Sequence, residues 1–481
     1  MYGKYEAVIG SEIHVQLNTE QKIFCFCKNG PAAEPNQNIC EICTGYPGTL
    51  PLFNKEVLKS AIKAGLATNC QIAKENEFAR KHYFYADLPK GYQITQSDFP
   101  ICEEGFVEIE KADGTAKKIR IKRIHMEEDA GKNLHTESYG SLVDLNRAGT
   151  PLLEIVSYPD MTCPEEVALY LKAIHKIMVT LKITTGNMED GAFRSDTNIS
   201  IRLKGVKELG TKCELKNINS FKFIKDATEY EIKRQIELVE AGEEIVQQTR
   251  LWDTKLKTTY AMRDKETAAD YRYLPDPDLT KIKIKDDEIE RIRVSLPEFP
   301  QAKKIRFMLD YQLNNEDATI ITDEEELALY FEKAYRIVPS KLVITWFLRE
   351  VLKACKDNPG LRLETHMFTA EKFAELILLL EEKKVTQKIA QDIFSAVFLT
   401  GQSPKIYAEE HMLLGGMLGE EELVKIIKEV FIQNQASVQE LQSGKDRVRG
   451  FLIGKIMATV KGKADPKDIN RIFEKEMTSL G

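Results

Sequence analysis

The stretch from residue 12 to residue 17 reads Glu12-Ile13-His14-Val15-Gln16-Leu17, a strict alternation of polar and apolar side chains. Successive side chains of a β-strand point to opposite faces, so this stretch predicts a strand with one apolar and one polar face. The same alternation returns in residues 143–146, 194–203 and 212–216. Such strands are typical of an antiparallel sheet that covers a core on one side and faces water on the other.

A helix start and a later change of pattern set the expected domain organisation. The run Thr162-Cys163-Pro164-Glu165 predicts a helix start with a capping box, because Pro fits the first turn and Thr and Glu can bind free N–H groups. Strand patterns dominate as far as Pro297 and Pro300, and amphipathic helical patterns follow. We therefore expect an α+β fold. A mainly antiparallel-sheet domain would span residues 1–295, followed by two all-α domains over 296–405 and 406–481.

Composition excludes several classes of protein. The chain has 481 residues, of which 43% are hydrophobic and 30% charged, so it is neither fibrous nor wholly disordered. No apolar run approaches the about 20 residues needed to cross a bilayer, and residues 1–6 lack the pattern of a signal peptide. We therefore expect a cytoplasmic protein without membrane contact. The formal net charge of -7 means that any nucleic-acid contact must be a local basic patch.

Acidic side chains collect on the polar faces of the expected strands. Several carboxylates with a neutral imidazole suit a hard cation, and Mg²⁺ takes one or two carboxylates together with phosphate oxygens. Which of Glu127 and Glu128 faces the site stays open. Glu127 does so if Ile124 faces the core, unless a bulge at residues 122–123 reverses the parity. The candidate Mg²⁺ ligands are Glu12, His14, Glu127, Glu128, Glu189 and Glu214.

Basic side chains accompany these acids. A cation surrounded by Arg and Lys is what phosphoryl transfer requires, because catalysis there consists mainly of positioning and of neutralising phosphate charge. The alternative is that the acids and bases are simply solvated on a wet sheet face. The candidate phosphate-facing or substrate-carboxylate-binding bases are Lys90, Arg147, Arg194, Lys212 and Lys216.

A nucleotide would not be held by a standard glycine-rich loop. The sequence contains neither G-x-x-x-x-G-K-[ST] nor G-x-G-x-x-G. Residues 80–94 are a better candidate for ATP binding, because they join aromatic side chains that can stack on a base to a Pro-Lys-Gly turn. Within this segment, the candidate nucleotide contacts are Tyr83, Tyr85, Lys90 and Gln93. The alternative is an aromatic strand and turn that only packs in the core.

Four of the nine cysteines form a cluster, Cys25, Cys27, Cys40 and Cys43. A Cys-x-Cys and a Cys-x-x-Cys separated by a loop can close a tetrahedral thiolate site around Zn²⁺. Such a site would be structural, because four sulfurs leave no open coordination position. The alternative is four reduced thiols. The sequence shows no hydrolase nucleophile motif, so any transferred nitrogen must be released elsewhere.

The end of the chain is locally basic. Residues 444–475 hold nine bases against four acids, which suits contact with an RNA backbone or, alternatively, a merely solvated face. The bases are Lys445, Arg447, Arg449, Lys455, Lys461, Lys463, Lys467, Arg471 and Lys475.

Six motifs together resemble the GatB family, the B subunits of bacterial tRNA-dependent amidotransferases. They are residues 12–17, HMEEDAGK at 125–132, VDLNRAGTPLLEIVS at 143–157, residues 188–200, GTKCELKNINSF at 210–221 and DYRYLPDPDL at 270–279. The likeness extends over essentially the whole chain. Ser11 and Asp190 depart from the Leu and Glu that are more usual in the family.

The resemblance implies a cradle domain similar to glutamine synthetase-type catalytic folds and a tRNA-binding tail. It implies that ATP phosphorylates the side-chain carboxylate of mischarged Asp-tRNA(Asn) or Glu-tRNA(Gln), and that ammonia then displaces the phosphate. An amidase A subunit would release this ammonia from glutamine, and a small C subunit would brace the heterotrimer. The rival interpretation is a non-catalytic tRNA-binding scaffold, which predicts no ATP turnover that depends on mischarged tRNA.

Overall fold

The computed structural model describes residues 2–136, 140–262, 271–414, 418–442, 447–460, 464 and 466–479. The chain divides into two compact units, Met1–Pro300 and Gln301–Gly481. The first unit is built on a large sheet and the second is helical, so the predicted α+β class is confirmed. The second unit contains two separate hydrophobic clusters, one drawn from residues 307–414 and the other from residues 418–477. The predicted boundary between two helical domains at 405 stays a prediction.

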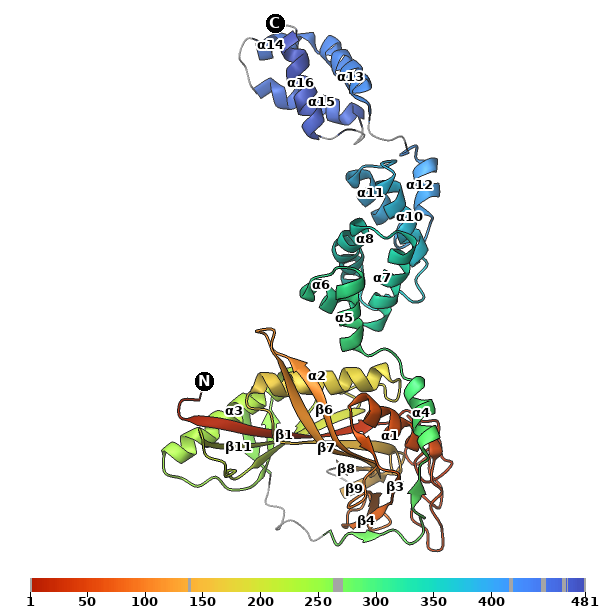
Figure 1. Cartoon of the computed structure of the whole chain (residues 1–481), viewed down its shortest axis with the longest axis vertical. Coiled ribbons are helices and arrows are strands. Elements are labelled where there is room, and N and C mark those ends of the chain that lie inside the picture. The colour runs from red at the N-terminus through yellow and green to blue at the C-terminus, as the bar shows by residue number, and fades with distance from the viewer. Residues whose placement is uncertain are drawn as a thin grey trace. The chain divides into compact units, whose positions relative to one another are not determined.

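A nine-stranded sheet forms the framework of the first unit (Figure 1). All neighbouring strands are antiparallel except β12 and β13, which run parallel. In spatial order the strands are β14 (Thr258–Ala261), β13 (Thr249–Asp253), β12 (Cys213–Ile218), β11 (Phe193–Leu203), β1 (Tyr5–Gln16), β10 (Pro151–Ser157), β7 (Ala116–Glu128), β6 (Cys102–Glu110) and β2 (Gln71–Ile72).

Three smaller sheets complete the first unit. The sheet β15-β4-β5 is joined to the large sheet through contacts between β5 and β7. Its strands are β15 (Leu274–Pro275), β4 (Ala79–His82) and β5 (Tyr92–Thr95). The other two are pairs, β16 (Ile282–Lys283) with β3 (Glu75–Asn76) and β8 (Lys132–Thr136) with β9 (Gly140–Asp144).

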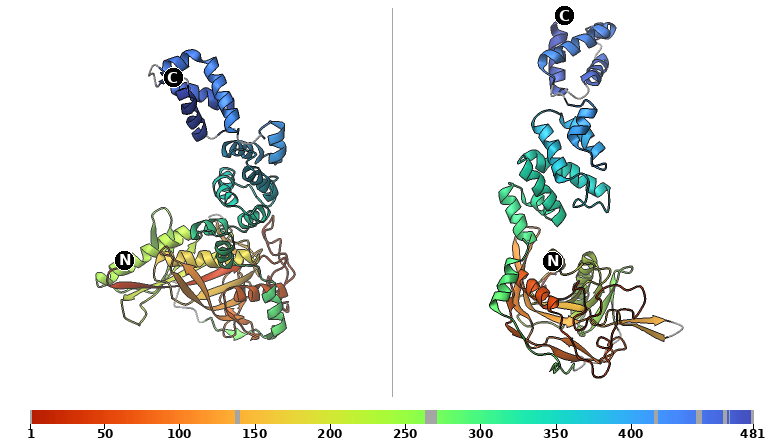
Figure 2. Two further views of the ribbon diagram at one scale, coloured as in Figure 1. Left: turned by 45° about the horizontal axis from the view of Figure 1, so that its top comes forward. Right: turned by 90° about the vertical axis from the view of Figure 1, so that its right-hand side faces the viewer.

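The predicted two-faced character of β1 explains where the core lies. Ile9, Ile13 and Val15 are fully buried on the face that α1 (Lys55–Ala67), α2 (Pro164–Thr180) and α3 (Phe221–Glu240) cover (Figure 2). Glu12 and His14 lie on the opposite face, so the sheet carries its apolar core on one side and its ionisable side chains on the other.

The start of α2 differs in detail from its prediction. The helix begins at Pro164 with Cys163 as the N-cap residue, and the Cys163 side chain makes no capping hydrogen bond. Glu166, not Glu165, reaches back and accepts from the backbone N–H and the hydroxyl of Thr162, at 2.8 and 3.1 Å. Proline at the first helical position shifts the helix start by one residue, and the acidic partner shifts with it.

Ser11 places a hydroxyl on the core-facing side of β1. It is buried, its backbone N–H donates to Ser157 Oγ at 2.9 Å, and its own Oγ lies 2.9 Å from Ser195 Oγ. These three hydroxyls belong to three neighbouring strands, β10, β1 and β11. Because buried polar groups are costly without partners, the serines satisfy one another within the core layer.

The remaining helices are short to medium in length. In the first unit α4 (Asp286–Val294) follows the sheets. The others are α5 (Pro300–Asp310), α6 (Asn315–Ile321), α7 (Glu325–Ile337), α8 (Lys341–Trp346), the π-helix η1 (Phe347–Val351), α9 (Leu352–Asp357), α10 (Ala370–Glu381), α11 (Gln387–Val397), α12 (Pro404–Glu410), α13 (Glu420–Gln433), α14 (Gln435–Gln442), α15 (Arg447–Val460) and α16 (Pro466–Ser479). Within the described parts of the chain, no helix has both the length and the apolar character required to cross a membrane.

A buried carboxylate fastens α3 to the sheet edge formed by β13 and β14. Glu231 is fully buried; it accepts from Arg234 Nη2 at 2.6 Å and from Thr259 Oγ1 at 3.2 Å, and it lies 3.3 Å from Arg250 Nε. Burial alone would raise the pKa of Glu231, but the hydrogen bonds from Arg234 and Gln235 outweigh it and hold that pKa below its ordinary value.

Replacing Glu231 with Gln should destabilise the first unit by about 3 kcal/mol at pH 7, because the buried guanidinium group of Arg250 and the partly buried one of Arg234 lose their counter-ion. A depressed folded-state pKa stabilises above the unfolded-state pKa of about 4.3, and this stabilisation is lost as pH falls through the folded-state value. The difference in free energy of unfolding between the unchanged protein and Glu231→Gln should therefore become smaller below about pH 4. Urea unfolding followed by Trp252 fluorescence in a Trp346→Phe background measures it, and Glu237→Gln on the exposed side of α3 is the control. A difference independent of pH would contradict the charge argument.

Candidate active site

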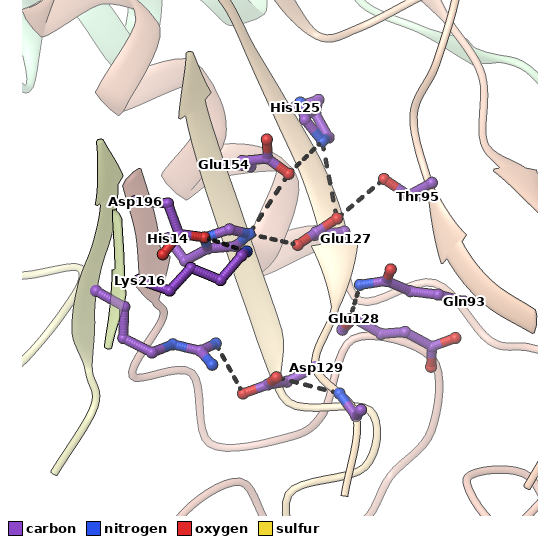
Figure 3. Close-up of polar contacts among 12 residues, drawn as sticks. His14, Gln93, Thr95, His125, Glu127, Glu128, Asp129, Glu154, Asp196 and Lys216 are labelled. Carbon is purple, nitrogen blue, oxygen red and sulfur yellow. Dashed lines mark hydrogen bonds and ion pairs between the residues drawn. The ribbon is translucent and has the colours of Figure 1, made fainter. Parts of the chain in front are cut away.

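Two histidines and two glutamates meet at the centre of the polar sheet face (Figure 3). His14 Nε2 lies 3.3 Å from Glu127 Oε1 and 3.5 Å from Glu154 Oε2. His125 Nε2 lies 3.2 Å from Glu154 Oε2 and 3.7 Å from Glu127 Oε2. Thr95 Oγ1, on β5, donates to Glu127 Oε2 at 3.1 Å. One imidazole nitrogen of His14 and one oxygen each of Glu127 and Glu154 lie within 4.8 Å of one another, close enough to share a metal ion.

Strand register brings this cluster together. Glu154 on β10 stands directly opposite His14 on β1 and directly opposite His125 on β7. Glu127 follows His125 by two residues and therefore points to the same face. The pairing of β10 with β7 shifts beside Ser157, so a bulge does exist near residue 122, but it precedes Ile124 and leaves the alternation from 124 onward intact. Of the two neighbours, Glu127 thus faces the cluster.

Burial makes the charges of this cluster depend on one another. Burial alone would lower the pKa of His14, but hydrogen bonds with Glu127 and Glu154 outweigh it and raise that pKa to about 10. The same pairing raises the pKa of His125 and lowers the pKa values of Glu127 and Glu154, against the opposing effect of burial. The carboxylates are therefore ionised at neutral pH. A divalent cation would take the place of the Nε2 proton of His14, because a protonated imidazole has no electron pair to donate. The two ionised carboxylates and the neutral imidazole then match the donor set that such a cation requires.

A second acidic group lies beside the first, across β1, β11 and β12. Burial, and then the nearby charges of Glu154 and Glu214, raise the pKa of Glu12, so each of these two carboxylates lies near that of Glu12. Lys216 Nζ lies 2.7 Å from Asp196 and 3.3 Å from Glu214, and Thr249 donates to Glu214 at 2.9 Å. Lys212 is exposed, but its charge acts on Glu12.

Asp129 fixes two arginines at the edge of the same face. Arg147 contacts Asp129 Oδ2 through Nε at 3.2 Å and also through Nη2, while Arg194 Nη2 lies 3.2 Å from the same oxygen. Both arginine side chains stay about 40% exposed, at 37% and 39%. Guanidinium groups held in this way keep donors free for a phosphate or carboxylate.

The Glu128 side chain lies apart from the cluster, whereas the candidate nucleotide segment borders it, since the charge of Glu127 contributes to raising the pKa of both Lys81 and Tyr83. The Glu128 side chain pairs with Lys90 and accepts from the backbone N–H of Ile94 at 2.8 Å, and Figure 3 shows its carboxylate directed away from Glu127. Gln93 is buried and donates to the backbone carbonyl of Glu128 at 2.7 Å. Lys90 and Glu128 line a hollow of about 200 Å³ beneath the cysteine loops.

The two candidate tyrosines stand beside each other. Tyr83 donates to Gln93 Oε1 at 3.4 Å, and its ring lies 5.9 Å from that of Tyr85, which is half exposed. Glu189 occupies a turn before β11, where its side chain is exposed and its backbone N–H binds Asn187. The structure thus does not bring Glu189 into either acidic group. Asp270, in the motif at 270–279, lies outside the described residues.

Sequence reasoning overlooked several residues of this site. Glu154 has the clearest signal, because it is the acid on the polar parity of Pro151–Ser157, between the core-facing Leu153 and Ile155. His125 and Asp129 fall on the polar face with Glu127 once Ile124 and Met126 face the core, but they were not among the candidate site residues. Thr95 had no such signal, since only folding brings β5 against β7.

The four cysteines also converge. Their sulfur atoms lie within 4.8 Å of one another, with Cys40 and Cys43 Sγ at 3.9 Å. A tetrahedral Zn²⁺ with Zn–S bonds of about 2.3 Å holds its sulfurs at about 3.8 Å from one another. The hydrogen bond between Cys25 and Cys43 lowers the pKa of Cys43, which favours its thiolate form, and raises the pKa of Cys25. The geometry and chemistry of these side chains therefore fit a tetrathiolate metal.

The polar sheet face carries an acidic cluster with flanking bases, and four cysteines form a separate group. Ionisable groups with shifted pKa values that cluster in this way are typical of a catalytic domain rather than of a surface that only binds. Comparison with protein families agrees. Residues 7–290 match the family model of the GatB/GatE catalytic domain, and residues 329–477 match that of the GatB domain.

Individual relatives match along nearly their whole length. The chain is 47% identical over 478 residues to the B subunit of the aspartyl/glutamyl-tRNA(Asn/Gln) amidotransferase of Geobacter sp. (strain M21), an alignment that covers 98% of this chain and 99% of the relative. It is 45% identical over 473 residues to the protein of the same name from Persephonella marina, with coverage of 98% and 99%. The chain belongs to the GatB family, and the resemblance inferred from its motifs is confirmed.

Replacing Glu127 or Glu154 with Gln should weaken binding of Mn²⁺, a spectroscopic substitute for Mg²⁺, by about tenfold or more, because each change removes an anionic ligand. Glu128→Gln is the matched neighbour and should bind Mn²⁺ as the unchanged protein does. Electron paramagnetic resonance of free Mn²⁺ measures the affinity. Equal affinity in Glu127→Gln and Glu128→Gln would contradict the placement of the cation at His14.

Proposed function

We propose that this chain is the subunit of a tRNA-dependent amidotransferase that activates and amidates the side-chain carboxylate of mischarged Asp-tRNA(Asn) or Glu-tRNA(Gln). The observation that carries the proposal is the convergence of His14, Glu127 and Glu154 on one sheet face with exposed arginines at its edge. The names of the relatives supply the same substrates and the same reaction class.

A carboxylate is a poor acyl donor, so the reaction needs activation. In the first step the terminal phosphoryl group of ATP passes to a side-chain oxygen of the aminoacyl ester, which gives an acyl phosphate and ADP. In the second step ammonia attacks the acyl carbon, phosphate leaves and a proton is released. Both steps concentrate negative charge on phosphate oxygens, and stabilising that charge is the main catalytic task.

The described side chains divide this task between them. His14, Glu127 and Glu154, with Glu12 and Glu214 beside them, would hold Mg²⁺, which when bound neutralises phosphate charge. Arg147 and Arg194, oriented by Asp129, would bind phosphate or the substrate carboxylate, and Lys212 and Lys216 flank the acids on the other side. Tyr83 and Tyr85 offer aromatic surface for the base of ATP. Glu128 pairs with Lys90 and therefore does not belong to the proposed set of Mg²⁺ ligands.

Ammonia must come from another polypeptide, because the sequence has no glutaminase nucleophile motif. We infer a heterotrimer with an amidase A subunit and a small C subunit, acting in the cytoplasm. We also infer that the four cysteines hold a structural Zn²⁺, which their sulfur positions fit.

The last helices are the proposed tRNA contact. Several bases of this region pair with acids: Arg449 lies 2.7 Å from Glu474, and Arg471 lies 3.4 Å from Glu420. Lys455 on α15 is exposed and lies 5.7 Å above the ring of Phe451. Gly450 and Gly454, four residues apart on the same helix, have open space where a side chain would stand, so a backbone phosphate can approach the helix closely there. Lys445, Lys461 and Lys463 lie outside the described residues.

Glu12→Ala and Glu214→Ala should abolish ATP-dependent amidation while sparing glutamine hydrolysis, because the acids act on phosphoryl transfer and not on the amidase. The assay uses the chain assembled with its A and C subunits, ATP, glutamine and each mischarged tRNA. Glu208→Ala, in the exposed loop between β11 and β12, is the control. Detection of an acyl phosphate with the unchanged protein distinguishes the enzyme from a scaffold, and full amidation by both variants would overturn the proposal.

Lys455→Glu should weaken tRNA binding and lower the slope of log affinity against log salt by about one, because one phosphate contact is lost. Lys425→Glu, a change of the same charge on α13, is the control for net charge. Filter binding over a salt series measures both quantities. An equal effect of the two changes would point to general repulsion and against a contact at α15.

A further inference from the structure

Lys22 is a lysine buried without an acidic partner. Its side chain is fully buried, although burying a charge is costly unless it is paired. Its ammonium group donates to the carbonyl oxygens of Asn38 at 2.7 Å and Leu145 at 3.4 Å, and lies 3.7 Å from Cys43 Sγ. Among the described residues no carboxylate pairs with it.

The four cysteines explain this burial if they hold a metal. Zn²⁺ with four thiolates carries a net charge of -2, and an adjacent ammonium halves that charge within the buried site. Without a metal, the charge of Lys22 would be balanced only as far as Cys43 Sγ, 3.7 Å away, is a thiolate. The stem of Lys22 also packs close to Gly149: a methyl group added at Gly149 would lie 3.5 Å from Lys22 Cδ and 3.6 Å from Cys43 Cβ.

The loop that carries the cysteines is bound directly to the segment that carries Arg147. Asn36 donates to the carbonyl of Val143 at 2.9 Å and accepts from the backbone N–H of Leu145 at 2.7 Å. The backbone N–H of Asn38 donates to Asn146 Oδ1 at 2.8 Å. Together with the Lys22 contact to Leu145, these bonds join residues 36–38 to residues 143–146.

That segment leads directly into the active site. The backbone N–H of Thr150 donates to the carbonyl of Arg147 at 2.9 Å, and Gly149 N–H donates to the carbonyl of Asp129 at 3.0 Å. Asp129 is the residue that orients Arg147 and Arg194. Residues 36–38 of the cysteine loop therefore support the segment 143–150. The positions of Arg147 and Arg194 depend on that segment through Asp129.

We propose that Lys22 is the counter-ion of the four-cysteine metal site and that metal loading, acting through Lys22 and Asn36, fixes residues 143–150 and thereby positions Arg147. Lys22 is thus a positioning residue and touches no substrate. This inference rests on the proposed zinc site and is independent of the amidation reaction.

The test combines zinc affinity with hydrogen exchange on the full chain. Lys22→Met should lower zinc affinity, measured by competition with a chromophoric chelator, by about 10–100-fold, the usual effect of losing an outer partner of a metal ligand. Lys28→Met, an exposed lysine of the same loop, should leave it unchanged. In the unchanged protein, removing zinc should accelerate amide exchange across residues 143–150.

Asn36→Gly keeps the test decisive if Lys22→Met does not fold. Asn36 is exposed and has a φ of 56°, which glycine adopts easily, so the change removes only the side-chain amide. This variant should bind zinc normally yet lose the zinc-dependent protection of residues 143–145. Unchanged zinc affinity in Lys22→Met would overturn the counter-ion role, and exchange indifferent to zinc would overturn the coupling. A chain that binds no zinc would remove the site itself while leaving the amidation proposal standing.

Discussion

The structure depends on holding ionised carboxylates at a site that is largely shielded from solvent. Glu127 and Glu154 sit among three strands at the middle of a nine-stranded sheet, where an unpaired charge would cost several kcal/mol. His14 and His125 supply the compensating charge. The opposite face of the same strands is filled by isoleucine, leucine and valine side chains beneath three helices, so the sheet is rigid where the ionisable groups need fixed positions.

Much of this arrangement was readable from the alternation of residues along each strand. Parity alone placed Glu12 and His14 on a shared face, but it left open whether Glu127 or Glu128 joins them. The motifs identified the family correctly. Parity could not predict which residues lie opposite each other on neighbouring strands. Glu154 stands opposite both histidines because of the strand register, which is set by the folded core and by a bulge beside Ser157.

Two other predicted Mg²⁺ ligands, Glu128 and Glu189, lie outside the acidic cluster because their backbone directs their side chains elsewhere. Glu128 follows Glu127 directly, so the pleat turns its side chain to the other side, where Lys90 and the backbone of Ile94 bind it. Glu189 lies in a turn, and no periodic pattern says where a turn side chain points. The cysteine spacing correctly predicted that the four thiols converge, because a chain of only 19 residues keeps them close together. Nothing in the sequence distinguishes the neighbouring Lys22 from a surface lysine.

The serine trio within the core layer has an evolutionary consequence. The backbone N–H of Ser11 binds Ser157 Oγ, and the Ser11 hydroxyl pairs with that of Ser195, on the two adjoining strands. A leucine at this position keeps the backbone N–H that binds Ser157, but it leaves the buried Ser195 hydroxyl without its partner and adds bulk between the strands. Replacement of Ser11 by an apolar residue is therefore expected to go with loss of the hydroxyl at position 195, whereas residue 157 is not tied to the side chain at position 11 in this way.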